Sequence, residues 1–353
     1  MAAPSPAEQF SNDRNALQNR ITALQESTRL TQVRQAVEDL QTRVNAFPQR
    51  VADLRERGYA FEKDLADQAA DFFKQWNALS PQLSAQLGEQ TATLAASLQS
   101  IQAAMAELAG QQPGPPASSL LQGMQSRTES LEAAVTAAER QISGMYESFG
   151  GQAGTLAGRL DKLEWMLAQL TEAKFSLLPT ESGVAAIKAI WCKQGKQRDD
   201  DPSGVLYLTD QRLLFEEKEE VVTKKVLFVA TEKQKVQELK WEVPVALLEE
   251  IKPSKQGMLK NEDHLDLRFA TGAPIQDAHV HIWEDGNLWL QLLNRAKAKD
   301  FDSSRAIAID QDALARLKAL PSQCPSCGGN ISQVVLRGQT DVKCQYCGFV
   351  IHL

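Results

Sequence analysis

The chain has 353 residues, a formal net charge of −7 and 6 % aromatic residues. This length predicts two or three domains, and the mild acidity excludes a strongly basic protein built to bind nucleic acid or anionic membranes. The first twenty residues contain no apolar block like that of a secretory signal, and no apolar run approaches the ~20 residues of a membrane-spanning helix. We therefore expect a cytoplasmic protein.

The first half of the chain has the spacing of a coiled coil. Between residues 30 and 72, apolar side chains recur at alternating steps of three and four, which are the a and d positions of about five heptads. Pro48 lies inside this seam without changing its phase, which predicts a kinked but continuous helix. An earlier seam at residues 10–24 has a different phase, so we expect an irregularity near residues 25–30.

Two further helical stretches follow. One seam, at residues 87–108, begins after a turn predicted at Ser80-Pro81 and ends in the Gly- and Pro-rich linker at 110–117. The next stretch contains glycines that cost roughly 1 kcal/mol each against alanine, and they predict a weak hinge between 144 and 158. Together these patterns predict a helical coiled coil over residues 8–175, with breaks near 80–81 and 110–117.

Narrow apolar seams must be buried, because such a strip does not stay solvated. The seams can pack against each other within one chain as an antiparallel bundle, or they can pair between chains. We favour the second arrangement and expect a homo-oligomer. A helix lying on a membrane is a poorer alternative, because the polar faces mix Gln, Glu and Arg.

The sequence changes character at Gly204–Glu216, where helical spacing gives way to alternation at period two. Leu206 and Leu208 share one strand face, and Leu213 and Phe215 repeat the pattern after a polar break. This alternation predicts a hairpin of two half-buried strands. Further strands are predicted at residues 184–191, 226–231, 236–243, 243–251, 265–269 and 279–283.

An amphipathic helix is predicted over Gly286–Lys299, with Trp289 on its apolar face. This helix, the motif G-x-L-Y-L-T-x-x-R-L-L-F at residues 204–215 and the segment Val243–Ile251 resemble parts of a GRAM domain, a relative of the pleckstrin-homology (PH) fold. The resemblance covers roughly residues 180–300. It implies a PH-like β-barrel capped by a helix.

Members of the GRAM/PH-like family often bind phosphoinositides or protein partners, so the resemblance implies a binding surface. A lipid headgroup would need several cations that converge at the loops between the first strands. The corresponding loop contains Lys193, Lys196 and Arg198, but the run Asp199–Asp201 offsets their charge. We therefore favour a protein partner over membrane lipid, and we expect the aspartates to be a solvated loop rather than a cation site.

The strongest chemical signal is a pair of C-x-x-C motifs, each followed by glycine, which permits a tight knuckle. Four thiolates suit tetrahedral Zn²⁺ and leave no open position, so we predict one structural Zn²⁺ per chain. An iron centre of the rubredoxin type and a redox dithiol are the alternatives. The segment resembles a zinc ribbon over residues 321–353, with strands at 331–336 and 342–344, after a linker with a short helix at 301–320. The predicted ligands are Cys324, Cys327, Cys344 and Cys347.

A second group of candidate residues lies near the end of the middle domain. His279 and His281 are two apart and therefore face the same side of a strand, with Asp277 just before them. Such a pair can hold a metal or act as a general base. Because no second carboxylate or nucleophile is near in sequence, we expect a solvated strand face without a function. His264 and Cys192 are also expected to have no special role.

These patterns predict a multidomain α + β protein with a helical coiled coil, a GRAM/PH-like domain and a zinc ribbon. They favour a non-catalytic cytoplasmic scaffold or adaptor that self-associates through the coiled coil and binds an unknown protein partner. One alternative is a peripheral membrane protein that binds lipid through the middle domain and its helices. The other is nucleic-acid binding by the ribbon, to which Arg337 and Lys343 add little positive charge.

Overall fold

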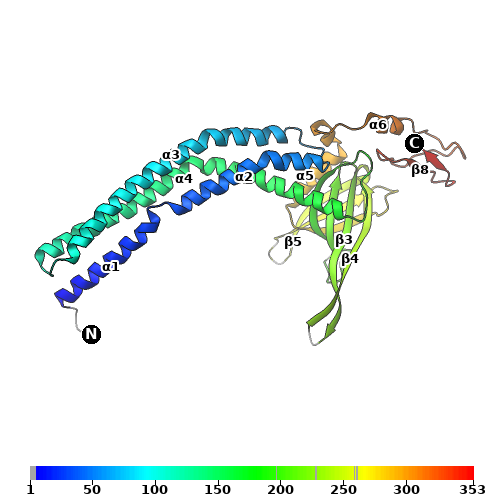
Figure 1. Cartoon of the computed structure of the whole chain (residues 1–353). Helices are drawn as coiled ribbons and strands as arrows, with labels where there is room; N and C mark the ends of the chain where they lie inside the picture. Colours follow the sequence, from blue (N-terminus) through cyan, green and yellow to red (C-terminus); the bar gives the residue numbers. More distant parts are fainter. Residues whose placement is uncertain (1–4, 196, 227–228, 258, 260) are drawn as a thin grey trace. The chain divides into compact units, whose positions relative to one another are not determined.

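The computed structural model describes residues 5–195, 197–226, 229–257, 259 and 261–353 (Figure 1). The chain forms two compact units. One comprises Met1–Gln49 and Asp67–Gly158, and the other comprises Arg50–Ala66 and Arg159–Leu353. The first unit is helical, whereas the second contains the sheet and the four cysteines.

Long helices form the first half of the chain. The predicted phase change near residues 25–30 is the break between the first two helices, where Leu30 adopts a left-handed φ of 52°. Pro48 lies inside a continuous helix, as predicted. Residues 110–114 separate the last two helices, so the predicted linker is present, but it ends at Gly114 rather than at residue 117. The helices are α1 (Pro6–Ser27), α2 (Thr31–Glu56), α3 (Leu65–Ala109) and α4 (Pro115–Glu172).

The turn predicted at Ser80-Pro81 is wrong, because α3 continues through these residues. α4 also continues through the glycines between 144 and 158, and the weak hinge predicted there stays a prediction. Trp76 and Leu83, on either side of Pro81, are buried. Their packing holds the helix together although proline removes one backbone hydrogen bond. In the same way Ile142 is buried beside the glycine region, so tertiary contacts outweigh the low helix propensity of glycine.

The seam predicted through Phe61 is also interrupted. Residues 57–64 form a loop between α2 and α3, and Gly58 has a positive φ of 88°. Phe61 is buried, but its partner is Phe301, with 5.5 Å between the ring centroids. Its apolar character therefore belongs to the second unit and not to a heptad.

The apolar seams of the first unit are buried within one chain. Phe72 of α3 lies between Phe47 of α2 and Phe149 of α4, at centroid distances of 5.7 and 5.6 Å. Arg20 of α1 binds Glu132 of α4 at 2.7 Å. These contacts are those of the intramolecular alternative, so burial of the seams does not require a second chain.

The second unit contains a seven-stranded antiparallel sheet in the order β4-β3-β2-β1-β7-β6-β5. The buried Trp289 lies on the helix that follows it, α5 (Gly286–Lys297), so the predicted terminal helix is confirmed. The separate strands predicted at 226–231 and 236–243 are wrong in part, because residues 229–244 form a single strand; residues 227–228 lie outside the described part of the chain. The strands are β1 (Gly183–Trp191), β2 (Ser203–Thr209), β3 (Arg212–Val226), β4 (Val229–Pro244), β5 (Leu248–Gln256), β6 (Glu262–Phe269) and β7 (Asp277–Ile282).

The predicted closed barrel is wrong. In the described part of the sheet, β4 and β5 form its two edges and do not pair with each other. A short 3₁₀ turn, η1 (Val245–Leu247), joins them and turns the chain away before a ladder can form. Aromatic side chains pack between the two halves of the sheet, with Trp241 of β4 at 6.4 Å from Phe269 of β6 and 5.8 Å from Phe215 of β3.

The prediction of half-buried strands at Gly204–Glu216 is wrong for β2, which is buried on both faces. Tyr207 and Leu214 have no exposed surface, although the alternation placed them on the polar face. The C-terminal part of α4 covers this second face, where Trp165 and Leu170 pack against the same cluster. Figure 1 shows the end of α4 beside β3.

Gly204, the first residue of the GRAM-like motif, lies against β3. A Cβ atom at this position would be 1.9 Å from the carbonyl oxygen of Glu216. We therefore expect Gly204→Ala to lower the free energy of unfolding by about 3 kcal/mol, because the paired strands must move apart. Urea denaturation followed by tryptophan fluorescence measures this loss.

The matched control is Gly151→Ala, at an exposed position of α4 where nothing lies within 4 Å of the added methyl group. This variant should be more stable than the parent by about 0.5–1 kcal/mol. Equal stability of the Gly204→Ala variant and the parent would contradict the close approach of the two strands.

The C-terminal part contains η2 (Asp300–Ser304), α6 (Gln311–Lys318), β8 (Asp341–Lys343) and β9 (Val350–His352). The short helix predicted within 301–320 is confirmed by α6. The predicted strand at 331–336 is wrong, because this segment is irregular and leads into a contact with the sheet. Within the described residues, no helix has both the length and the apolar character that crossing a membrane requires.

Candidate metal centre and its docking site

The two C-x-x-C motifs form loops with the same backbone hydrogen bonds. In the first, the Gly328 N–H donates to Cys324 O at 2.8 Å, and Cys324 N–H donates to Gly329 O at 2.8 Å. In the second, Gly348 and Cys344 make the equivalent bonds at 2.9 and 2.8 Å, the latter to Phe349 O. Gly328 and Gly348 have φ values of 72° and 76°, so the glycine after each pair has the conformation that the sequence predicted.

The four sulfur atoms converge, each within 4.8 Å of the others. Sγ of Cys324 lies 3.7 Å from that of Cys347, and Sγ of Cys327 lies 3.7 Å from that of Cys344. Such a group of thiolates matches the donor set and the tetrahedral preference of Zn²⁺. The sequence therefore identified one group of residues that the fold brings together.

Backbone N–H groups point at the sulfur atoms. Those of Cys347 and Tyr346 lower the pKa of Cys344 to about 6, so this thiol is readily deprotonated for metal binding. Cys324 and Cys344 are buried, whereas Cys327 and Cys347 are exposed. Apart from these two cysteines, only Val342 and Ile351 are buried in residues 321–353. The segment has almost no apolar core of its own.

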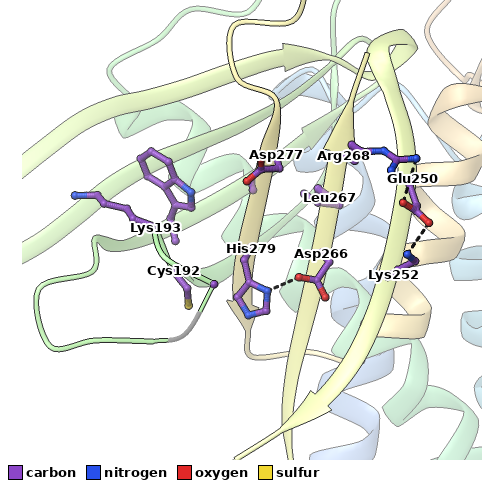
Figure 2. A pocket seen from close by; sticks show the side chains of 12 residues that line it. Cys192, Lys193, Glu250, Lys252, Asp266, Leu267, Arg268, Asp277 and His279 are labelled. Carbon is purple, nitrogen blue, oxygen red and sulfur yellow. Dashed lines mark hydrogen bonds and ion pairs between the residues drawn. The ribbon is translucent and has the colours of Figure 1, made fainter. Parts of the chain in front are cut away.

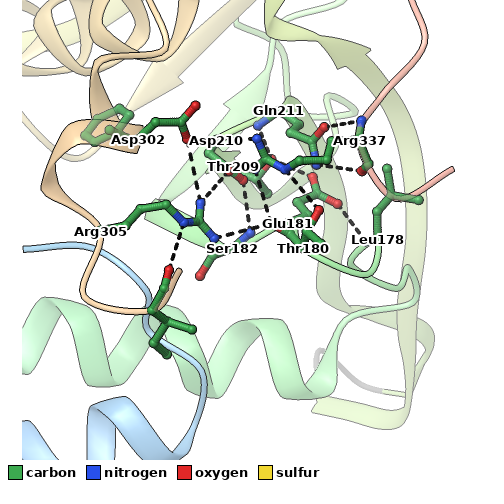
Figure 3. Close-up of polar contacts among 12 residues, drawn as sticks. Leu178, Thr180, Glu181, Ser182, Thr209, Asp210, Gln211, Asp302, Arg305 and Arg337 are labelled. Carbon is green, nitrogen blue, oxygen red and sulfur yellow. Dashed lines mark hydrogen bonds and ion pairs between the residues drawn. The ribbon is translucent and has the colours of Figure 1, made fainter. Parts of the chain in front are cut away.

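Arg337 attaches the four-cysteine segment (residues 321–353) to the sheet (Figure 3). Its Nη2 donates to the carboxylate of Asp210, in the turn between β2 and β3, and to Thr180 O at 3.2 Å. Arg305 reaches the same carboxylate at 2.8 Å from the opposite side. The side chains of Asp210, Arg305 and Arg337 are 3, 7 and 10 % exposed, so the contact is a buried ion-pair cluster.

Other groups fix the same junction. Arg337 N–H donates to Gln211 Oε1 at 2.6 Å, and Gln211 Nε2 donates to Arg337 O at 2.9 Å. Gly338 has φ 87°, and a Cβ atom there would lie 3.1 Å from Pro179 N. Burial raises the pKa of Asp210, and the Ser182 N–H and the two guanidinium groups oppose that rise. The junction is therefore specific in both shape and hydrogen bonding.

The other two residues of the turn hold the chain that enters β1. Arg212 binds both carboxylate oxygens of Glu181, at 2.9 and 2.6 Å. Thr209 Oγ1 donates to Glu181 at 2.6 Å. The sequence Thr209-Asp210-Gln211-Arg212 thus organises three separate segments, although the sequence predicted only a polar break between strands.

Residues 301–320 were predicted to be a linker, but part of this segment packs against the 57–64 loop. Phe301 packs on Phe61, and Arg305 lies over the same ring at 4.9 Å from its centroid. Ala306 N–H donates to Ala60 O at 2.7 Å. This part of the chain is packed on the 57–64 loop, and it delivers Arg305 to Asp210.

The prediction of a solvated face at His279 and His281 is wrong. Both are buried, as is His264 on the neighbouring strand β6. The strand register places His264 opposite His281, and Asp266 opposite His279. Cys192, just after β1, donates its N–H to His279 O at 2.8 Å. The fold therefore gathers residues that the sequence treated as separate and ordinary.

The predicted cationic loop is only partly described, because Lys196 lies outside the described residues. Asp201 is buried and accepts the N–H groups of Lys193 and Arg198 at 3.1 and 2.8 Å, so it caps the loop and is not part of a solvated run. On the neighbouring strands, Lys252 and Arg268 both bind Glu250, at 2.7 and 3.3 Å (Figure 2). Paired cations of this kind offer little attraction to a lipid phosphate.

No family model and no curated protein matches the chain. Solved structures align over most of its length, but with little similarity. The complex of PDZ-RhoGEF DH/PH domains with GTP-γ-S activated RhoA is 11 % identical, with 84 % of this chain and 96 % of that chain covered and a TM-score of 0.23. The linker-DH/PH domains of p115-RhoGEF are 9 % identical, with coverages of 82 and 98 % and a TM-score of 0.23.

This comparison contradicts the expectation that the chain is not an enzyme. The aligned proteins contain the DH/PH domains of RhoGEFs, and two of these structures include RhoA. That expectation is withdrawn. TM-scores this low carry no argument for a particular activity, so none is assigned in its place.

Proposed function

We propose that the chain is an adaptor that binds a protein partner through the four-cysteine segment, which is presented on a GRAM/PH-like domain. In this proposal the domain boundaries are those expected from the sequence: helical part 8–175, GRAM/PH-like domain 180–300, linker 301–320 and zinc ribbon 321–353. One structural Zn²⁺, held by Cys324, Cys327, Cys344 and Cys347, keeps the ribbon folded.

The observation that carries the proposal is the distribution of exposed side chains on the ribbon. Tyr346, Phe349 and Val350 are 66, 44 and 42 % exposed, although each is large and apolar. Exposed apolar groups of this kind, clustered in sequence on a small segment, support a surface for another protein. Aromatic anchors dominate the energy of many such interfaces.

The charge of the ribbon favours a protein over a nucleic acid. Its Arg and Lys residues are Arg337 and Lys343. Arg337 forms a buried ion pair with Asp210, so Lys343 is the remaining Arg or Lys side chain that could contact a phosphate backbone. Nucleic-acid binding depends on several such contacts, so the proposed partner is a protein.

Chemical crosslinking of the full chain in extracts of its own cells, followed by reconstitution with the purified partner, tests the proposal. We expect the double variant Tyr346→Ser/Phe349→Ser to lose at least tenfold in affinity, since removing two aromatic anchors costs more than ~1.4 kcal/mol. Its zinc content should be unchanged, because neither side chain is a ligand.

Lys343→Ser is the matched control on the same surface, and it should bind the partner as the parent does. A different result would overturn the proposal: salt-dependent binding of single-stranded or duplex nucleic acid that Lys343→Ser abolishes. Co-sedimentation with vesicles of anionic lipid, unaffected by the double aromatic variant, would favour the membrane alternative instead.

A further inference from the structure

One outer face of β6 and β7 carries a group of buried metal-binding side chains. His264 on β6 and His279 and His281 on β7 point away from the core face that contains Leu265 and Val280. The ligand atoms of Cys192, His264 and His279 all lie within 4.8 Å of one another. Figure 2 shows His279 between Cys192 and Asp266. Three buried donors from three separate segments are unusual on the outside of a sheet.

Asp266 determines how His279 presents its ring. Its Oδ1 lies 2.5 Å from His279 Nδ1, so the carboxylate accepts the Nδ1–H and leaves the lone pair on Nε2. That lone pair faces His264 Nδ1 at 2.9 Å. A carboxylate that orients a histidine in this way is a common partner of metal-binding imidazole.

When the rings of His264 and His279 are both neutral, at least one of their nitrogens lacks a suitable hydrogen-bond partner. If His264 carries its proton on Nδ1, its buried Nε2 is an acceptor without a donor, and this atom has no hydrogen-bond partner in the described residues. If the proton is on Nε2, two lone pairs face each other across 2.9 Å. The second arrangement directs Nε2–H toward Glu262, whose Oε2 is 3.7 Å away, and it requires a cation between the two rings.

We propose that Cys192, His264 and His279 form a second metal site, for a divalent ion of the Zn²⁺ class, and that Asp266 is the positioning residue for His279. One sulfur and two imidazole nitrogens are the donor set of borderline-soft ions such as Zn²⁺ and Co²⁺. A metal ion between the rings uses both facing lone pairs and leaves Nε2–H of His264 directed at Glu262.

The protonation of the free side chains is compatible with this site. Burial lowers the pKa of His264, and the nearby His281 and His279 reinforce that effect, so the ring is neutral at neutral pH. Burial and the charge of Asp201 raise the pKa of Cys192 to about 11, so metal binding releases one proton from the thiol.

The site has an open side. Cys192, His279 and Asp266 line a cavity of about 450 Å³, together with Trp191 and Lys193. With three protein ligands, the fourth position of a tetrahedral ion faces this cavity and takes water or a small ligand. In this respect the site differs from that of the four cysteines, which supply all four positions.

Metal analysis of the full chain, reconstituted with Zn²⁺ and then freed of excess metal, tests the proposal. We expect two Zn²⁺ per chain for the parent and one for each of the variants Cys192→Ser, His279→Gln and Cys344→Ser. The combination Cys192→Ser/Cys344→Ser should hold none. Asp266→Asn should still bind two, with an affinity at the second site reduced roughly 10- to 100-fold. His352→Gln, at an exposed histidine bound to Asp341, is the control and should retain two.

Co²⁺ provides a spectroscopic readout that does not depend on the measured number of metal ions per chain. In the Cys344→Ser background, Co²⁺ should give a thiolate-to-metal charge-transfer band that Cys192→Ser removes. The near-ultraviolet circular dichroism of each variant shows whether its sheet is folded. A single Zn²⁺ in the saturated parent would overturn the proposal and would leave a proton as the cation between the rings. A second metal that survives both Cys192→Ser and His279→Gln would overturn it as well.

Discussion

Replacing Asp210 by alanine should lower the free energy of unfolding by about 3–5 kcal/mol and release the four-cysteine segment from the sheet. The reason is that the variant leaves Arg305 and Arg337 buried without their shared counter-charge, and an unpaired buried charge is strongly destabilising. Asp302, at 3.9 Å from both guanidinium groups, is too distant to replace a hydrogen-bonded carboxylate. Urea denaturation measures the loss, and cleavage by trypsin after Arg337 measures the release.

The matched control is Asp341→Ala, which removes an exposed aspartate paired with the exposed His352. That change should cost less than about 1 kcal/mol, because solvent screens an exposed pair. A double-mutant cycle with Arg337→Met adds a second check. The double variant should be more stable than the sum of the single losses predicts, since removing the arginine removes the unpaired charge. Strict additivity would show that Asp210 and Arg337 do not interact.

Cys344→Ser should have the second large effect: loss of the metal and of ordered structure in residues 321–353. Segments of fewer than ~40 residues rarely fold without a metal or disulfides. This one buries only Val342 and Ile351 besides two of its cysteines, so we expect the proposed Zn²⁺ to provide most of its folding free energy. Nuclear magnetic resonance of the full chain should show the amide signals of these residues collapse to random-coil positions.

The structure adds a consequence that the motif alone did not imply. When the segment unfolds, Arg337 leaves Asp210, so the sheet should also become less stable, by about 1–3 kcal/mol. Lys343→Ser, in the same segment but neither a proposed metal ligand nor part of the junction with Asp210, is the control. An ordered segment in Cys344→Ser, or in the parent after chelation, would disprove the dependence on metal.

Patterns that act over a few residues were predictable from sequence. The geometry of the C-x-x-C-G motifs is local, because the glycine permits the tight turn and only two residues separate the two cysteines. Pro48 was tolerated and residues 110–114 ended a helix, as backbone chemistry predicts. The helix at Gly286–Lys297 followed from its apolar face.

Local propensity failed where packing outweighed it. Pro81 was predicted to lie in a turn between helices, but buried neighbours keep α3 continuous. The alternation in β2 predicted that one face is exposed to solvent, but α4 covers that face. Nothing in the strand itself records that a helix more than thirty residues away lies on it, because period two reports only which side chains share a face.

The sequence by itself determined the four-cysteine motif, the change from helices to strands after residue 175, the terminal helix of the sheet domain, and the apolar seams that had to be buried. The tertiary structure alone decided that those seams are buried within one chain, and that the sheet stays open. It also brought Asp210 to Arg305 and Arg337, and Cys192 to His264 and His279. The physical reason is the same in each case. Spacing fixes the direction of a side chain on its own element, whereas strand register and packing between distant elements fix what that side chain meets.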